Sequence, residues 1–188
     1  MGIPSGYTSG QVVQAVPTGI NSALVLINST TFTTAASVSL PTNTFTSTYD
    51  NYLVIIQTSA ISTTMSISGR FRAAGTDNTS SEYSNMFNLI DNNAGGNSSI
   101  SNNSQASFAL GTAQTSRPYQ GFIDVTTPFL TQQTCIHPRL ETQTAGSLSQ
   151  VLQGAGRFQL TNSFDSFSFI CSTGTFTGTV RVYGYANS

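Results

Sequence analysis

The sequence predicts an all-β protein: an antiparallel β-sandwich of jelly-roll-like topology with an extended N-terminal arm. Residues that favour the pleated sheet are abundant, with 28 Thr, 12 Phe and 7 Tyr in a chain of 188 residues. Apolar and polar residues alternate with a period of two in several segments, and no stretch shows a convincing amphipathic helix. The segments change character about every ten residues, which is the spacing typical of a sandwich or barrel.

Residues 1–22 are expected to form the arm, because Gly and Pro are frequent there and the one short apolar piece is Gln11–Val16. Such an arm is suited to reaching a neighbouring subunit. Residues 23–188 are expected to form a single sandwich domain, since a chain of this length fits one domain with one hydrophobic core. The arm residues expected to make an intersubunit contact are Gln11, Val12, Val13 and Gln14.

The clearest strand pattern lies in the segment Met65–Ala73. Its apolar residues share one face and its Ser and Arg residues the other, which predicts a half-buried strand. The segment Ser166–Cys171 also alternates, and Thr175–Tyr185 follows it after a turn at Gly174. These last two segments together predict a β-hairpin.

Two short apolar runs, Ala23–Asn28 and Tyr52–Gln57, are typical of strands buried on both faces, although a helical turn would satisfy the same pattern. The segment Asp91–Ser104 is rich in Asn, Gly and Ser, so it is predicted to be an exposed loop tip. Further strands are predicted at Tyr83–Ile90, Ala106–Gly111, Gly121–Thr126, Thr134–Leu140 and Arg157–Asn162.

Charged residues are scarce. They make up 7% of the chain, the basic residues are six Arg without Lys, and the net charge is −1. We expect no nucleic-acid and no membrane partner, because both surfaces attract clustered cations and only Arg70 and Arg72 lie close together. These two residues are expected to form intersubunit ion pairs or to be solvated. Nearly uncharged faces suit homo-oligomeric packing, since few charges then lose their water.

The first residues lack the basic region and apolar run of a secretory signal. The longest apolar stretches, Leu24–Ile27 and Leu53–Ile56, are too short to cross a bilayer. We therefore expect synthesis in a cytoplasm. Cys135 and Cys171 are expected to be reduced, partly buried thiols there, with a disulfide as the alternative.

Few residues are available for catalysis: one His, two Cys and seven carboxylates. The sharpest candidate is Cys135-Ile-His137, because residues two apart on a strand point the same way and an imidazole activates a thiol. No third, orienting group is evident, and Pro138 indicates a strand end or edge. The carboxylates stand apart in the sequence, so no pair for glycoside hydrolysis is visible. We expect no catalytic residue and no enzyme activity.

No metal site is expected either. One His and two separated Cys do not provide a tetrahedral zinc site. The stretch Asp91–Asn97 contains oxygen ligands and glycines, but it lacks the spaced carboxylates and closing Glu of an EF-hand, so a plain turn is favoured. No motif for an organic cofactor is present, and no cofactor is expected.

Three passages follow one another in a distinctive order: Gly10–Gln14; Tyr49–Ile56, leading through Gly69–Arg72 to Gly75, Thr76 and Tyr83; and Gly174–Tyr185. In this order they resemble a family of small virion structural proteins and fibre-type modules of tailed phages that infect aquatic bacteria. The resemblance implies a β-sandwich over most of the chain. Physically, the Tyr residues are suited to capping a sandwich and the Gly residues to turns and close strand contacts. The residues expected to act as structural anchors are Tyr49, Tyr52, Gly174, Gly178, Tyr183 and Gly184.

The resemblance implies a place in the virion and two alternative tasks. A capsid decoration or cement protein docks as an oligomer, typically a trimer, on the major capsid protein or other virion proteins and stabilises the shell. A head or tail fibre protein recognises a glycan or protein of the host surface. The absence of heptads for a coiled-coil shaft favours decoration. A glycan-cleaving enzyme is the third and least favoured class.

Overall fold

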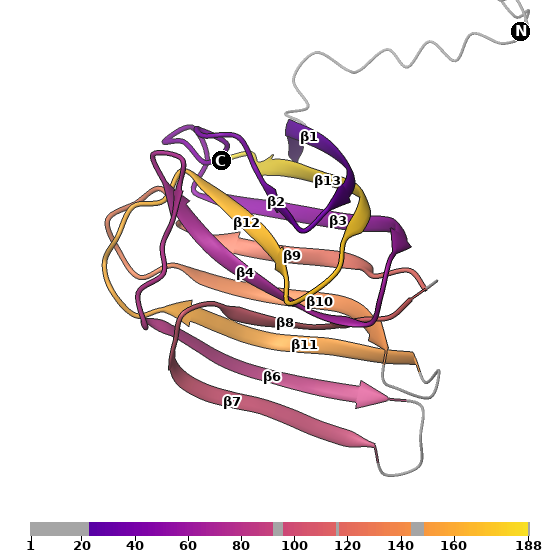
Figure 1. Cartoon of the computed structure of the whole chain (residues 1–188). Helices are drawn as coiled ribbons and strands as arrows, with labels where there is room; N and C mark the ends of the chain where they lie inside the picture. The colour runs from indigo at the N-terminus through magenta and orange to yellow at the C-terminus, as the bar shows by residue number, and fades with distance from the viewer. Residues whose placement is uncertain (1–22, 92–95, 116, 144–148, 188) are drawn as a thin grey trace, which may run out of the picture.

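The computed structural model describes residues 23–91, 96–115, 117–143 and 149–187. The predicted arm, including Gln11–Gln14, lies outside the described residues. The described part contains no helix and consists of two antiparallel β-sheets that pack face to face (Figure 1). The predicted all-β antiparallel sandwich is therefore confirmed, while jelly-roll connectivity stays a prediction.

The larger sheet has eight strands, and each is antiparallel to its neighbours. Hairpin partners β9, β10 and β11 lie at its centre, and β1 and β7 form its two edges. Its order is β1 (Leu24–Ala35), β13 (Phe176–Tyr185), β3 (Asn51–Ile61), β9 (Gln120–Thr126), β10 (Cys135–Gln143), β11 (Ser149–Phe158), β6 (Tyr83–Asp91) and β7 (Asn97–Gln105).

The smaller sheet covers one face of the larger one; β2, β12 and β4 lie in front of the long strands in Figure 1. Strand β8 pairs with β4 and extends this layer. The strands of the smaller sheet are β2 (Ser37–Ser39), β12 (Ser166–Cys171), β4 (Met65–Ala73), β5 (Thr76–Asp77) and β8 (Phe108–Ala113).

The core between the sheets is built from alternate positions of the facing strands. In β13 every second side chain from Phe176 onward is buried, and β4 buries Met65, Ile67 and Phe71. The alternation predicted for β4 is confirmed except at Ala73, which is exposed at the end of the strand. The buried side chains of both sheets form one hydrophobic cluster.

Aromatic rings dominate the contact between the two sheets. The fully buried ring of Phe71 in β4 stacks on Phe164 at 4.8 Å between centroids and meets the edge of Phe108 at 5.5 Å. Tyr83 and Phe158, which belong to the larger sheet, complete the cluster at 4.8 Å from Phe108 and 5.0 Å from Phe164 respectively. Each such pair contributes about 0.5–1.5 kcal/mol beyond the burial of its area.

Two glycines make room for these rings. A Cβ at Gly69 in β4 would lie 2.3 Å from Cζ of Phe167, and one at Gly156 in β11 would lie 2.8 Å from Cδ1 of Phe108. Real side chains do not approach so closely, so the glycines allow the rings to lie directly on the backbone.

Several predicted elements match the structure. Tyr83–Ile90 and Gly121–Thr126 are confirmed as β6 and β9, and Ala106–Gly111 and Thr134–Leu140 overlap β8 and β10 with shifted ends. The strand predicted at Arg157–Asn162 is largely wrong, because β11 begins at Ser149 and already ends at Phe158.

The exposed loop predicted at Asp91–Ser104 is wrong, because Asn97–Gln105 is the edge strand β7. Its backbone pairs with β6, for example at Ile100 with Phe87. Its side chains are almost all exposed and polar, so the strand depends on backbone hydrogen bonds and has no apolar alternation that a sequence could display.

The predicted hairpin of Ser166–Cys171 with Thr175–Tyr185 is also wrong. β12 pairs with β2 and β4 in the smaller sheet, whereas β13 pairs with β1 and β3 in the larger one. The chain crosses between the sheets at the predicted turn, where Gly174 has φ +63°. Alternation shows which face of a strand is buried, but it does not show which strand is its neighbour.

Burial on both faces is wrong for the two apolar runs. β1 is an edge strand whose side chains are mostly exposed or half-buried. In β3 the side chains of Tyr52, Val54 and Ile56 are buried in the core, while Leu53 and Ile55 point to the other face of the sheet and are half-buried.

Among the expected anchor residues, Tyr52 is fully buried, and its hydroxyl accepts a hydrogen bond from the Thr46 amide (2.7 Å) and donates one to the Thr46 carbonyl (2.8 Å). Tyr49 meets the Tyr52 ring edge-on at 6.1 Å. It also lies against Gly184, where a Cβ would come within 2.5 Å of the Tyr49 ring. These contacts hold the start of β3 against the end of β13.

Gly178 lies beside β3, where a Cβ would be 2.3 Å from the Gln57 carbonyl oxygen. The register between β13 and β3 shifts at this point. Tyr183 is half-buried on the face opposite the core, where β13 places it beside Leu26 of β1 and Leu53 of β3.

We expect Phe71→Ala to lower the free energy of unfolding by about 3–5 kcal/mol, because it removes the central ring between the sheets and leaves a cavity. Urea unfolding followed by tyrosine fluorescence measures this. The control Leu160→Ala changes a half-exposed side chain and should cost roughly 0.5 kcal/mol. Equal losses in the two variants would contradict the central role of the Phe71 ring.

Candidate interaction surface

The larger sheet has one face toward the core and one turned away from the smaller sheet, which we call the outer face. The outer face carries most of the exposed large hydrophobic side chains of the described residues. Phe122 is 37% exposed and Met86 67%. Six of the eight such residues lie on this face: Leu24, Leu26, Met86, Ile90, Phe122 and Val151.

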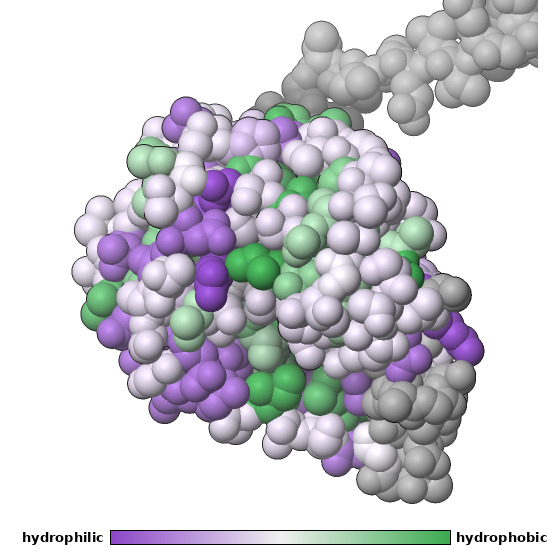
Figure 2. All heavy atoms as spheres, viewed as in Figure 1, coloured by the Kyte–Doolittle hydropathy of each residue, from purple (hydrophilic) through white to green (hydrophobic). Residues whose placement is uncertain are grey.

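The opposite side of the molecule has a different character. Seen from the side of the smaller sheet, the surface is mostly pale and purple, with green hydrophobic residues in separate spots (Figure 2). Exposed Ser side chains lie on this side at Ser37 and Ser39 of β2 and at Ser66 of β4. Contiguous exposed apolar surface on a folded protein commonly marks a site of interaction, whereas scattered apolar residues are ordinary.

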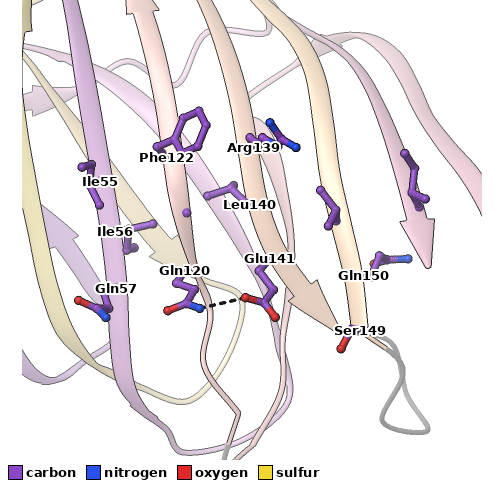
Figure 3. Close-up of a pocket in the computed structure, with 13 residues that line it drawn as sticks. Ile55, Ile56, Gln57, Gln120, Phe122, Arg139, Leu140, Glu141, Ser149 and Gln150 are labelled. Carbon is purple, nitrogen blue, oxygen red and sulfur yellow. Dashed lines mark hydrogen bonds between the residues drawn. The ribbon is translucent and has the colours of Figure 1, made fainter. Parts of the chain in front are cut away.

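The outer face is hollowed into a trough of about 730 Å³ across strands β3, β9, β10, β11 and β6. Cross-strand register builds its walls: Ile55 of β3 lies beside Phe122 of β9, which lies beside Arg139 of β10. The next row along the strands places Val151 beside Glu141 and Ile90. Figure 3 shows Ile55, Phe122 and Arg139 standing on neighbouring strands.

Backbone forms part of the floor of the trough at Gly121. This residue has φ +147°, and a Cβ there would lie 2.2 Å from the Arg139 carbonyl oxygen. Because no side chain fits at this position, only glycine lets the backbones of β9 and β10 approach so closely. Any other residue at position 121 would have to push β9 and β10 apart.

The polar groups of the trough are few and balanced. The Gln120 amide donates a hydrogen bond to Oε2 of Glu141 at 2.9 Å (Figure 3). Arg139 lies on the same strand as Glu141, two residues earlier and on the same face. The positive and negative groups therefore offset each other, and the trough offers apolar surface with amide hydrogen-bonding groups rather than a net charge.

The catalytic candidates lie elsewhere on the outer face. Cys135 and His137 share one side of β10, and His137 faces Asp124 across the ladder to β9. The Asp124 carboxylate accepts its hydrogen bond from the Tyr185 hydroxyl. No hydrogen bond or ion pair joins Cys135, His137 and Asp124 to one another among the described contacts. A nucleophile and base without mutual contact supply no reason to assign catalysis.

Arg70 and Arg72 lie on β4, far from the trough, and both have partners within the chain. Arg70 Nε donates to the Ala106 carbonyl at 2.9 Å. Arg72 Nε lies 3.0 Å from Oδ1 of Asp77, as an ion pair rather than a well-aligned hydrogen bond, and the guanidinium also donates to the carbonyls of Leu40 and Gly75. An intersubunit ion pair would have to compete with these contacts.

Within the described part of the chain, no group of three or more His, Cys, Asp and Glu is arranged to hold a metal ion. No helix long and apolar enough to span a membrane occurs there. Cys135 and Cys171 are free and half-buried, as expected.

No family model, curated protein or solved structure matches the chain. The resemblance to virion proteins therefore stays a prediction, and the outer face carries the functional argument.

The residues of the trough were not singled out from the sequence. A signal was present in β3, where Leu53 and Ile55 interleave with the buried Val54 and Ile56. Such a run predicts burial on both faces, yet in this structure the second face is the open outer face. Apolar residues on an uncovered face indicate a surface that a partner covers.

Burial raises the pKa of Tyr185 to about 12, and its hydrogen bond to the Asp124 carboxylate acts in the same direction. The unfolded chain loses this proton near pH 10. The contribution of Tyr185 to stability is therefore full below about pH 10 and is lost as the pH rises from about 10 to 12. We expect Tyr185→Phe to flatten the fall in urea midpoint over this window, and an unchanged fall would contradict the assignment.

Burial raises the pKa of the Cys171 thiol to about 11. At pH 8 the thiol is protonated and should react slowly with a disulfide reagent such as DTNB, because only the thiolate attacks. In Cys135→Ser, which keeps Cys171 alone, the rate should rise about tenfold per pH unit up to about pH 11. A rate that is already maximal at pH 8 in the folded variant would contradict this.

Proposed function

We propose that this protein is a structural component of a tailed-phage virion and acts as a capsid decoration protein. It docks as an oligomer on the protein shell through its outer face and stabilises the shell. The observation that carries this proposal is the concentration of exposed Leu, Met, Ile, Phe and Val side chains on one face of the larger sheet. The resemblance of the sequence to small virion proteins supports a location in the phage particle.

The mixed character of the outer face supports docking on protein. Arg139, Glu141 and Asp124 lie on this face among the apolar residues, and a protein partner can pair such charges at the rim while its apolar groups cover the centre. The eight-stranded sheet also gives a broad and stiff platform, because its backbone is hydrogen-bonded from β1 to β7. A shell lattice presents the same surface many times, so a modest contact repeated in an oligomer gives strong attachment.

A receptor-binding fibre protein is the second candidate, and the composition of the trough favours it. Phe122 offers a ring for stacking, and Gln120, Glu141 and Arg139 offer the hydrogen-bonding groups that sugars require. In that case the trough binds a host glycan and the outer face points away from the particle.

Imaging of purified particles labelled with an antibody against this chain separates the two candidates. Decoration places the label over the icosahedral shell, and a fibre role confines it to the tail or to fibres. Label on the tail alone would overturn the decoration proposal.

A binding experiment tests the outer face itself. Purified protein is added to particles that lack it, and the bound fraction is measured against concentration. We expect Phe122→Asp to weaken binding roughly 30-fold, because loss of a buried aromatic anchor costs at least about 2 kcal/mol. The control Leu160→Asp alters an exposed Leu in the connection after β11 and should bind as the unaltered chain does. Equal binding by both variants would rule out docking through the trough.

A further inference from the structure

A second hollow opens between the two sheets, at the side of the molecule where the smaller sheet ends. Strand β7 extends past the smaller sheet (Figure 1), so its core-side residues Ser98 and Asn102 are exposed. The hollow lies between β6 and β7 of the larger sheet and β4 and β8 of the smaller one, and we call it the inter-sheet groove. Its volume is about 230 Å³, and it shares only Gln150 with the lining of the outer-face trough.

The polar side chains of the inter-sheet groove are amides and hydroxyls. None of the described residues that line it is charged, and Asn85, Asn102, Gln105 and Gln150 contribute amides. An ionic ligand would lose its water there without gaining a counter-charge. A purely apolar ligand would strip water from the amides without replacing their hydrogen bonds. The lining therefore fits a neutral ligand with hydrogen-bonding groups.

Hydrogen bonds within the chain orient two of these amides. The buried Asn85 accepts from the Ala109 amide (3.1 Å) and donates from Nδ2 to Oδ1 of Asn102 (2.8 Å). The Asn102 oxygen is thereby occupied, so Asn102 can offer its NH₂ group to a ligand. Gln105 Nε2 donates to the Asn103 carbonyl at 2.8 Å, so Gln105 can offer its oxygen as an acceptor. A positioned donor and a positioned acceptor thus both line the groove.

Size and apolar lining narrow the class of ligand further. Drug-sized ligands occupy pockets of roughly 300–1,000 Å³, so a groove of this smaller volume suits a molecule the size of one sugar ring. Leu89 and Ile100 add apolar surface to the lining and pack against the core. A sugar matches this combination, because its ring presents C–H groups while each hydroxyl both donates and accepts a hydrogen bond.

We propose that the inter-sheet groove binds one neutral sugar unit. The Asn102 NH₂ group donates to one hydroxyl, Gln105 Oε1 accepts from another, and the C–H groups of the ring lie against Ile100. Docking through the outer face leaves the groove accessible, because the groove opens between the sheets beside β7. The sugar site is therefore independent of the proposed docking function and adds carbohydrate recognition to it.

NMR spectra of the ¹⁵N-labelled full chain test the site through its side-chain amide signals. The probes are the methyl glycosides of glucose, galactose, mannose and N-acetylglucosamine. We expect at least one of them to shift the signals of Asn102 and Gln105 in a saturable manner. No saturable shift with any probe would overturn the proposal, since the groove then holds only water. Shifts of Gln57 and Gln120 instead would place the sugar in the trough and also overturn it.

Two variants test the donor at position 102. Asn102→Asp keeps an oxygen for the Asn85 amide but lacks the NH₂ group, and we expect it to weaken sugar binding about tenfold. Asn102→Ala should weaken binding to a similar extent. The matched control Asn103→Ala changes the same residue type one position along, where the side chain points to the other face of β7, and should bind as the unaltered chain does. Equal binding by Asn102→Asp and Asn103→Ala would contradict the assignment.

The methyl group of the probes distinguishes two sources of the sugar. Binding of a methyl glycoside supports the terminal unit of a glycan as the ligand, whereas binding of the corresponding free sugar alone supports a soluble monosaccharide. These titrations use purified protein and a site outside the docking surface. Shell label without sugar binding therefore refutes only the groove proposal, and sugar binding with tail label refutes only decoration.

Discussion

The contact of the Phe71 ring with rings from both sheets is the interaction on which the rest of the structure depends. Phe71 stacks on Phe164 and meets Phe108 and Phe167 edge-on, while Tyr83 and Phe158 bring in the larger sheet. The ring lies at the centre of the one hydrophobic cluster to which both sheets contribute, so the cover of each sheet depends on this contact together with its neighbours. This packing of rings also requires Gly69 and Gly156, because only a residue without a side chain lets the rings of Phe167 and Phe108 lie on the backbone at these positions.

Unequal sheet size links the core to the proposed function. Eight strands face five, so the smaller sheet covers one side of the larger sheet and leaves its outer face open. That face is apolar at Phe122, Val151 and Ile90, and it is hollowed into the trough that these residues line. The same interleaved side chains that fill the core in β3 thus also supply the docking surface, which explains why β3 is apolar on both faces.

Local patterns were most informative where one face of a strand is buried. The alternation in β4 predicted its buried face correctly, because burial of Met65, Ile67 and Phe71 demands a period of two. The same logic missed β7, whose polar side chains face water on both sides and whose stability comes from backbone hydrogen bonds to β6. The same reasoning wrongly predicted that β12 and β13 form a hairpin, because alternation does not indicate which strand is the neighbour.

The sequence by itself determined the all-β class, the position of most strands and the shortage of charge, because each of these follows from residue type and spacing. Only the tertiary structure decided which strands are neighbours, and therefore which side chains meet. Phe122, Arg139 and Val151 come from three strands, and only cross-strand register brings them into one trough. Register is set by contacts between distant segments, including the close approach at Gly121, so no local pattern could have placed that surface.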